Sequence, residues 1–226
     1  MRTLAILPVK SFHAAKQRLA GSLAPDSRGS LAQAMVTDVL GALRAARRVD
    51  AIAVVTAERA ARSLAGTDVA VLHDDAEAGQ SAAAQIGIRH ALADGFDRAV
   101  LVPGDTPLLD PGEVDGLLDR AAADGVAICV VADRHGTGTN ALVLAPPDAL
   151  APSFGPGSLA RHMAAAAASG LPHRLERAPS LEHDVDTPDD LAALRSVLGS
   201  ARGRAQRTRG ALDGLERPAG RALAPG

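Results

Sequence analysis

Short, almost continuously apolar segments recur along this chain, and segments with helical periodicity separate them. The apolar segments comprise residues 4–9, 51–56, 68–72, 98–102, 126–132 and 141–144. Helical patterns occupy residues 27–47, 81–92, 158–168 and 187–198, and a further helix begins at Asp110. Strands without polar alternation need cover on both faces, so the pattern predicts a three-layer α/β domain around a mostly parallel sheet. Such a sheet binds its ligands at the carboxyl ends of its strands.

Composition and charge narrow the class of protein. The 226 residues are 47% hydrophobic with a formal net charge of −2, which supports a buried core and argues against a general binder of nucleic acid. Trp and Tyr are absent and there are three Phe, too few for base-stacking platforms. A single cysteine, Cys129, excludes an intrachain disulfide framework and a cysteine-cage zinc site. Because no apolar run is long enough for a membrane span or a signal peptide, we expect a cytoplasmic protein without a membrane partner.

The strand and helix patterns end near residue 198. Beyond it, residues 199–226 carry six Arg against two acidic residues, among scattered Gly, Ala and Pro. This composition is typical of a solvated extension. We therefore predict a folded domain of residues 1–198 and a flexible tail of residues 199–226, which an acidic partner could also contact.

A basic loop follows the first predicted strand. Of the 24 basic residues only two are lysines, Lys10 and Lys16, and both lie in this loop together with Arg18. Lys presents a compact, mobile charge and Arg binds two oxygens at once, so the three could hold a polyphosphate. An ordinary solvated loop would have the same spacing, and the GxxxxGK[ST] pattern of a P-loop is absent.

Three aspartates lack an evident structural role. Asp105 ends an apolar strand, and a later aspartate already caps the next helix. Asp184 and Asp186 alternate in an extended segment, so their side chains would point the same way, while Thr187 caps the following helix. Facing carboxylates repel unless a cation lies between them, and Mg²⁺ suits few carboxylates completed by phosphate oxygens and water. An acidic solvated turn is the alternative.

Gly-rich loops with hydroxyl groups occupy residues 133–140 and 154–158. Ser158 opens a predicted helix, and the free backbone N–H groups of a helix start attract a phosphate or carboxylate. A plain capped helix is the simpler alternative. A third loop, residues 74–81, lies between a strand and a helix and could also face a ligand.

Together these segments resemble one protein family. They are LPVK and AKQRLA within residues 7–20, VPGDTPLL at 102–109, DRHGTGTN at 133–140, FGPGS at 154–158 and DVDTPDDL at 184–191. In order and spacing they resemble the CofC/FbiD guanylyltransferases of deazaflavin coenzyme F-420 biosynthesis, which are similar to the molybdenum-cofactor nucleotidyltransferases. The resemblance implies a three-layer, Rossmann-like nucleotide-diphospho-sugar transferase fold, GTP as donor and Mg²⁺ as cofactor.

The resemblance also implies roles for individual residues. The metal-binding positions match Asp105, Asp184 and Asp186. The positions that hold a phosphoenolpyruvate-type acceptor match Thr139, Gly155 and Ser158. The nucleotide-binding positions match Pro8, Lys10, Lys16, Arg18, Gly79 and Gly104. Lys10, Lys16 and Asp105 are the residues expected to act in catalysis.

The expected activity is transfer of GMP from GTP to phosphoenolpyruvate, with 2-phospho-L-lactate as the alternative acceptor. GTP and the acceptor are then the small-molecule partners, no nucleic acid is expected, and a second copy of the chain is a further candidate partner. A glycosyltransferase could use a similar sheet and an Asp-x-Asp motif, but sugar sites usually offer aromatic platforms. A non-catalytic nucleotide-binding subunit is the alternative from another class.

Overall fold

The computed structural model describes residues 1–12, 16–200 and 203–216. The strands are β1 (Thr3–Pro8), β2 (Ala51–Thr56), β3 (Ala70–His73), β4 (Arg98–Leu101), β5 (Ile128–Ala132), β6 (Thr139–Leu144) and β7 (His173–Glu176). The α-helices are α1 (Pro25–Ala45), α2 (Arg59–Ala65), α3 (Gln80–Ala93), α4 (Pro111–Ala123), α5 (Ser158–Ser169), α6 (Pro188–Ser200) and α7 (Gln206–Glu216). Two 3-10 turns are η1 (Gln17–Leu19) and η2 (Pro179–Leu181). Strands and helices therefore alternate, as the apolar pattern predicts.

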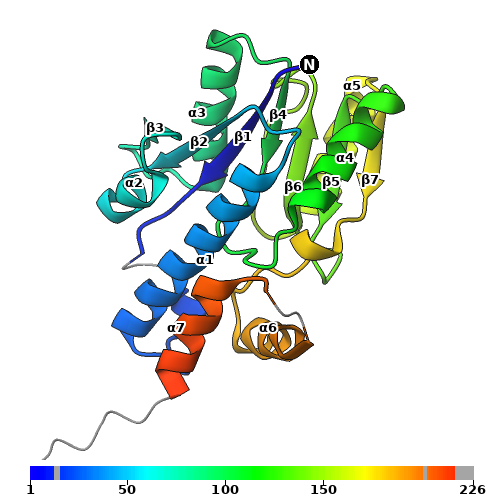
Figure 1. Ribbon diagram of the computed structural model, residues 1–226. Helices are drawn as coiled ribbons and strands as arrows, with labels where there is room; N and C mark the ends of the chain where they lie inside the picture. The colour runs from blue at the N-terminus through cyan, green and yellow to red at the C-terminus, as the bar shows by residue number, and fades with distance from the viewer. Residues whose placement is uncertain (13–15, 201–202, 217–226) are drawn as a thin grey trace, which may run out of the picture.

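One sheet of seven strands, in the order β3-β2-β1-β4-β6-β5-β7, forms the middle layer (Figure 1). Neighbours among β1 to β4 are parallel, and β7 is parallel to β5. β6 runs antiparallel to both β4 and β5. The predicted three-layer α/β fold with a mostly parallel sheet is confirmed, with β6 as the antiparallel strand.

Both faces of the sheet are covered, and β1 serves both cores. Ala5 and Leu7 join the core under α1, α2, α4, α6 and α7, whereas Leu4 and Ile6 join the core under α3 and α5. Successive strand side chains point to opposite faces, so a strand covered on both sides has no polar face. α3 lies so close to β1 that a Cβ atom at Gly87 would overlap the Ile6 side chain.

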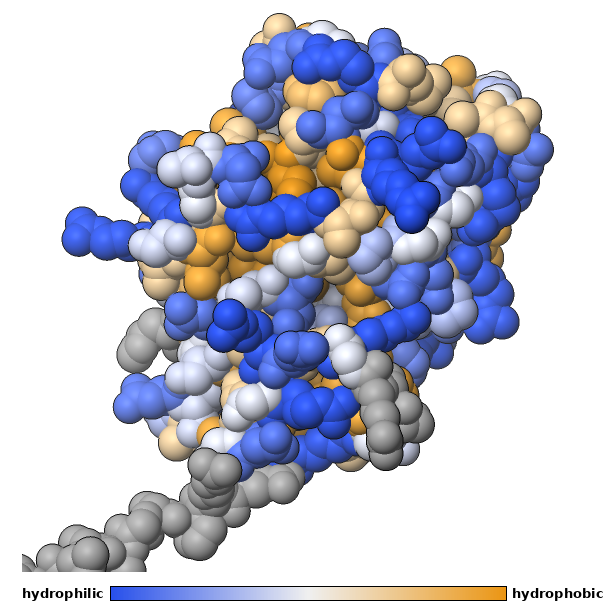
Figure 2. All heavy atoms as spheres, in the orientation of Figure 1, coloured by the Kyte–Doolittle hydropathy of each residue, from blue (hydrophilic) through white to orange (hydrophobic). Residues whose placement is uncertain are grey.

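Polar side chains cover most of the face that Figure 2 shows. Three regular elements escaped the sequence pattern, namely α2, β7 and α7. β7 is a short edge strand of sequence HRLE with exposed and half-buried residues in alternation, so it has no continuous apolar run. No helix in the described ranges is long and apolar enough to cross a membrane.

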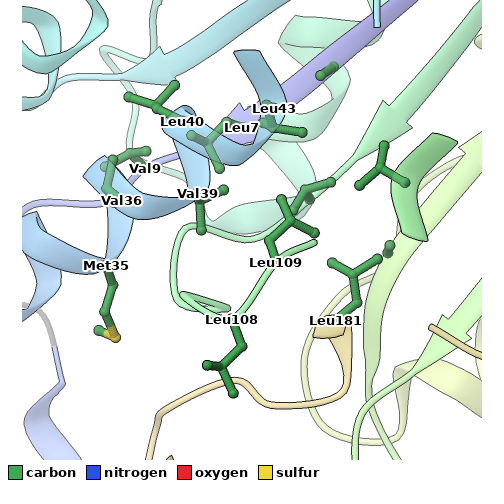
Figure 3. Close-up of a cluster of buried hydrophobic side chains, with 14 of the residues drawn as sticks. Leu7, Val9, Met35, Val36, Val39, Leu40, Leu43, Leu108, Leu109 and Leu181 are labelled. Carbon is green, nitrogen blue, oxygen red and sulfur yellow. The ribbon is translucent and has the colours of Figure 1, made fainter. Parts of the chain in front are cut away.

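The loop after β4 is anchored in the larger core. Leu108 and Leu109 are buried there beside side chains of β1, α1 and η2 (Figure 3). The same loop passes so close to α1 that a Cβ atom on Gly104 would lie 2.9 Å from Val36 Cγ2. Glycine is needed here for that approach. The packing on both sides fixes Asp105, which lies within this loop.

The prediction of a flexible tail from residue 199 is wrong for the part of it that the structure describes. α6 continues to residue 200, and α7 packs alongside α1 (Figure 1). Leu212 is buried in the larger core, and Asp38 of α1 accepts hydrogen bonds from the backbone N–H groups of Arg207 and Thr208 at 3.1 and 2.8 Å. Composition misled here because the cap comes from a distant residue and the buried face of α7 is narrow. Residues 201–202 and 217–226 of the predicted tail lie outside the described residues.

The packing of α7 can be tested by truncating its buried side chain. Leu212→Ala should lower the free energy of unfolding by about 2–4 kcal/mol, because it leaves a cavity between α7 and α1. Asp213→Ala, an exposed neighbour on the same helix, should change it by no more than about 0.5 kcal/mol. Urea denaturation followed by circular dichroism measures both. Equal midpoints for the two variants would mean that α7 adds nothing to the core.

Candidate active site

A cavity of about 480 Å³ opens at the carboxyl ends of the first four strands. Residues within three positions of the ends of these strands line it: Lys10 after β1, Ala57 after β2, Asp74 after β3 and Gly104 after β4. This is the sheet edge that the parallel pattern predicts for ligands. The lining includes every residue predicted for the nucleotide, namely Pro8, Lys10, Lys16, Arg18, Gly79 and Gly104. The loop of residues 74–81 also contributes to the lining.

Lys16 joins two of the predicted metal-binding aspartates inside this cavity. Its Nζ lies 2.5 Å from Asp105 Oδ2 and 2.9 Å from Asp186 Oδ1. The side chain of Lys16 is 9% exposed, and burial alone would lower the pKa of its ammonium group. The negative charges of Asp105 and Asp186 outweigh that effect, so the pKa is raised and the ammonium stays charged. Lys16 also has a left-handed backbone with φ of 56°, a conformation that costs energy outside glycine.

The backbone brings the acidic segments together. The N–H group of Val185 donates to the carbonyl oxygen of Asp105 at 3.2 Å, and the Val185 side chain is fully buried. Val185 lies between Asp184 and Asp186, so this contact holds both aspartates beside the loop after β4. The segment of Asp184 and Asp186 therefore lies beside the loop of Asp105, as a shared metal site would require.

A capping box holds the following turn. Thr187 Oγ1 accepts from the Asp190 N–H group at 3.2 Å, and Asp190 Oδ2 accepts from the Thr187 N–H group at 2.7 Å. Thr187 is thus the predicted cap of α6. Arg134 donates to the other oxygen of Asp190 through Nε at 2.9 Å. Burial alone would raise the pKa of Asp190, but hydrogen bonds from Thr187 and Arg134 bring it to about 2.

The surroundings of Asp184 disfavour the charged form of its carboxyl group. Burial, together with the negative charge of Asp105, raises the pKa of its carboxyl group to about 6. A hydrogen bond of 3.1 Å from Asn140 Nδ2 opposes this rise. Like charges in a partly dry pocket favour binding of a cation, because a cation would relieve their repulsion.

The three aspartates do not form a complete metal cage by themselves. Within residues 1–12, 16–200 and 203–216, no three His, Cys, Asp or Glu side chains are arranged to hold a metal ion. Asp105 and Asp186 nevertheless converge on one positive charge, the Lys16 ammonium group, and Asp184 is close enough to interact electrostatically with Asp105. Mg²⁺ commonly takes one or two carboxylates and completes its shell with phosphate oxygens and water. The donor set fits such an ion.

The residues predicted for the acceptor lie outside the cavity lining and gather around the start of α5. The Ser158 N–H group donates to Gly155 O at 3.0 Å, and the Leu159 N–H group donates to Thr137 O at 3.2 Å. These two N–H groups are therefore not free for an anion, so that part of the prediction is wrong. Both N–H groups already donate to carbonyl oxygens, one in the loop before α5 and one in the β5–β6 connection.

Two contacts place this acceptor cluster next to the cavity. The Phe154 N–H group donates to Ser81 Oγ at 2.8 Å, and Ser81 adjoins the cavity-lining Gln80. Thr139 is followed along β6 by Asn140, whose side chain donates to Asp184. The predicted nucleotide, metal and acceptor residues therefore form one continuous region at the carboxyl edge of the sheet.

The sequence alone does not indicate the roles of some residues in this region. Asn140 sits in the predicted Gly-rich loop, and its buried side chain links η2 to Asp184 through bonds of 2.8 and 3.1 Å. A polar residue next to Thr139 at the start of an apolar strand was the available signal. His162 contacts Thr139 from within α5, and nothing in a helical pattern points to it. Cys129 is buried as predicted, and burial raises the pKa of its thiol to about 11.

Comparison with known proteins gives the same family as the motifs. The family described as CofC-like guanylyl transferases matches residues 3–204. A phosphoenolpyruvate guanylyltransferase from Conexibacter woesei is 50% identical over 218 residues, which cover 96% of this chain and 98% of that protein. A 2-phospho-L-lactate guanylyltransferase from Methanothermobacter thermautotrophicus is 35% identical over 195 residues, which cover 86% of this chain and 84% of that protein.

A solved structure supports the fold independently. A protein from Desulfovibrio desulfuricans G20, described as a nucleotide-diphospho-sugar transferase, superposes with a TM-score of 0.76 over 95% of both chains at 18% sequence identity. At that identity the likeness shows the fold, whereas the family match and the relative that is half identical over nearly its whole length show descent. The chain therefore belongs to the family of CofC-like guanylyltransferases.

Proposed function

We propose that this guanylyltransferase transfers the GMP unit of GTP to phosphoenolpyruvate, yielding enolpyruvyl-diphospho-guanosine and pyrophosphate in coenzyme F-420 biosynthesis. The observation that carries the proposal is the convergence of Asp105 and Asp186 on one positive charge within a cavity lined by a basic loop. Two highly charged anions need such a site if they are to react with each other. The relative from C. woesei, which is named for this reaction, supports the choice of acceptor.

The reaction needs alignment and charge neutralisation more than proton transfer. A phosphate oxygen of the acceptor attacks the α-phosphorus of GTP, and a new P–O–P linkage forms. The bond between the α-phosphorus and the bridging oxygen to the β-phosphate breaks, and pyrophosphate leaves with that electron pair. The acceptor phosphate is already anionic at neutral pH, so no general base is required. The rate then depends on positioning and on groups that stabilise the developing charge.

The basic loop supplies charge for the triphosphate. Lys10 and Arg18 are exposed and line the cavity, and within the part of the chain that the structure describes neither forms an ion pair with an acidic side chain. They are therefore available to bind β- and γ-phosphate oxygens and to stabilise departing pyrophosphate. Arg can contact two oxygens at once, and Lys can follow the phosphate as it moves.

Mg²⁺ is the cofactor we propose for this site. Asp105 and Asp186 would hold it, with Asp184 beside them. A bound Mg²⁺ supplies charge neutralisation between the two reacting anions and orients their oxygens. In the structure the ammonium group of Lys16 lies between Asp105 and Asp186, so it supplies positive charge to the same two carboxylates.

A second acceptor, 2-phospho-L-lactate, has support from the M. thermautotrophicus relative at 35% identity. It differs from phosphoenolpyruvate by reduction of the carbon–carbon double bond, so that the carbon bearing the phosphate is tetrahedral rather than planar and a methyl group replaces the methylene. Both acceptors carry the same phosphate and carboxylate groups. The higher identity to the phosphoenolpyruvate enzyme favours phosphoenolpyruvate for this chain.

An acceptor screen tests the proposal. The purified protein is incubated with GTP and MgCl₂ and with phosphoenolpyruvate, 2-phospho-L-lactate or 3-phosphoglycerate, and pyrophosphate release and product mass are measured. We expect the fastest release with phosphoenolpyruvate. Release only with 2-phospho-L-lactate would establish the second acceptor instead. No release with any of the three would overturn the proposed activity.

Removing either carboxylate charge should stop turnover without unfolding the protein. Asp105→Asn and Asp186→Asn should each lower kcat/KM by about 100-fold or more, since each removes a carboxylate that would hold Mg²⁺ and that pairs with the Lys16 ammonium group. Asp189→Asn removes an exposed carboxylate in the first turn of α6 and should leave kcat/KM near the wild-type value. Pyrophosphate release gives kcat/KM, and circular dichroism checks the fold. Wild-type activity in either of the first two variants would contradict the assignment.

The ammonium group of Lys16 should compete with a metal ion for the two aspartates. Lys16→Met removes this charge, so Mn²⁺ should bind about tenfold more tightly in the absence of nucleotide. Lys10→Met removes a charge from the same cavity without an ion pair to either aspartate, so it is the matched control. Electron paramagnetic resonance of Mn²⁺ measures affinity directly. Weaker or unchanged binding in Lys16→Met, relative to Lys10→Met, would refute competition.

A further inference from the structure

A fully buried histidine joins two parts of the acceptor cluster. His162 lies in α5 with 0% of its surface exposed. Its Nε2 accepts a hydrogen bond of 2.8 Å from the backbone N–H group of Ser153. Its Nδ1 lies 2.9 Å from Thr139 Oγ1 on β6. Both ring nitrogens are therefore occupied by neighbouring protein groups, and the imidazole bridges a strand and the loop that precedes α5.

The partners determine which nitrogen carries the proton. A backbone N–H group can only donate, so Nε2 must be the unprotonated nitrogen of a neutral ring. The proton is then on Nδ1, and Nδ1–H donates to Thr139 Oγ1. Burial, with a smaller contribution from the charge of Arg161, lowers the pKa of His162 to about 4, so the ring is neutral at physiological pH.

This tautomer leaves Thr139 as a donor. A threonine hydroxyl has one O–H donor and two acceptor lone pairs. Because a lone pair of Oγ1 receives the imidazole proton, the hydroxyl proton cannot point at the ring and is free to donate elsewhere. Thr139 is the first residue of β6 and is 7% exposed, so the residue is largely shielded from bulk solvent.

The same imidazole holds the loop that carries Gly155. The Phe154 ring meets it edge to face, with ring centroids 5.3 Å apart and planes at 75°. The bond from Ser153 and this ring contact fix two successive residues of the loop. The backbone N–H group of Phe154 in turn donates a hydrogen bond to Ser81 Oγ beside the cavity. A shift of the imidazole would therefore displace the Thr139 hydroxyl and the Gly155 loop together.

We propose that His162 is a positioning residue for the acceptor, which directs the hydroxyl proton of Thr139 toward the anionic carboxylate or phosphate of the three-carbon substrate. The inference rests on the proposed function, since it requires that Thr139 contacts the acceptor. His162 does not touch the substrate, and it acts through Thr139 and through the loop of residues 153–158.

Two substitutions separate the hydrogen bonds of the imidazole. The amide of Gln extends to the place of Nε2, so His162→Gln retains an acceptor for Ser153 but loses the donor to Thr139. The shorter amide of Asn matches Nδ1, so His162→Asn retains that donor. We expect His162→Gln to raise the KM for phosphoenolpyruvate about tenfold with little change in the KM for GTP. His162→Asn should stay closer to the wild-type KM, and equal acceptor KM values for the two variants would overturn the inference.

Thr139→Val distinguishes failure of this inference from failure of the proposed function. If the wild type uses phosphoenolpyruvate, Thr139→Val should raise its KM about tenfold, and His162→Gln added to Thr139→Val should raise it no further. An additive double variant would show that His162 does not act through Thr139. An unchanged KM in Thr139→Val would overturn the inference while the guanylyl transfer to phosphoenolpyruvate still stands.

Two further measurements distinguish a positioning role of His162 from a purely structural one. Met163→Ala removes a neighbouring α5 side chain that packs against the smaller core, so it should lower Tm while the acceptor KM stays unchanged. A comparable rise in KM would reduce His162 to a structural residue. In the ¹⁵N-histidine-labelled wild type, nuclear magnetic resonance should show the Nδ1–H tautomer for His162 at neutral pH. An Nε2–H tautomer or an imidazolium ring would contradict the proposal.

Discussion

The contact of one ammonium group with two carboxylates organises the working edge of this protein. Lys16 belongs to the loop after β1, Asp105 to the loop after β4, and Asp186 to the segment before α6. A buried charge is stable only when it is paired, so the Lys16 ammonium group, whose side chain is 9% exposed, depends on these two carboxylates. The Val185–Asp105 backbone bond adds a fixed distance between two of these segments. A region that concentrates charge in this way suits a reaction between two anions.

The two halves of the sheet carry different parts of the candidate site. The parallel half, β1 to β4, ends in the residues that line the cavity. The antiparallel strand β6 begins at Thr139 and Asn140, whose side chains point to opposite faces because they are neighbours in a strand. Thr139 meets His162 of α5 on one face, and Asn140 meets η2 and Asp184 on the other. One pair of adjacent residues therefore connects the acceptor cluster to the acidic segment through the sheet.

The α6–α7 region shows a related use of distant polar contacts. Asp38 accepts hydrogen bonds from the first backbone N–H groups of α7, which lie 169 and 170 residues further along the chain. Leu212 of the same helix is buried in the core that covers α1. α1 in turn packs against the loop after β4, where Gly104 meets Val36. The C-terminal helix thus supports, through α1, the same loop that carries Asp105. Composition alone pointed to solvated chain, because the numerous Arg and Gly residues obscured a single buried face.

The sequence alone determined the features that depend on neighbours within a few residues. They are the apolar runs of most strands, the helix caps at Asp110 and Thr187, and the family motifs. The α/β class followed from them, as did the six residues expected to bind the nucleotide, all of which line the cavity. Tertiary structure alone decided that Lys16 would bridge Asp105 and Asp186, that Asn140 would hold Asp184, and that His162 would orient Thr139. These bonds join residues between 23 and 170 positions apart. A local pattern specifies what an element is but carries no distance to a side chain on another element, which only the packing of the sheet and helices sets.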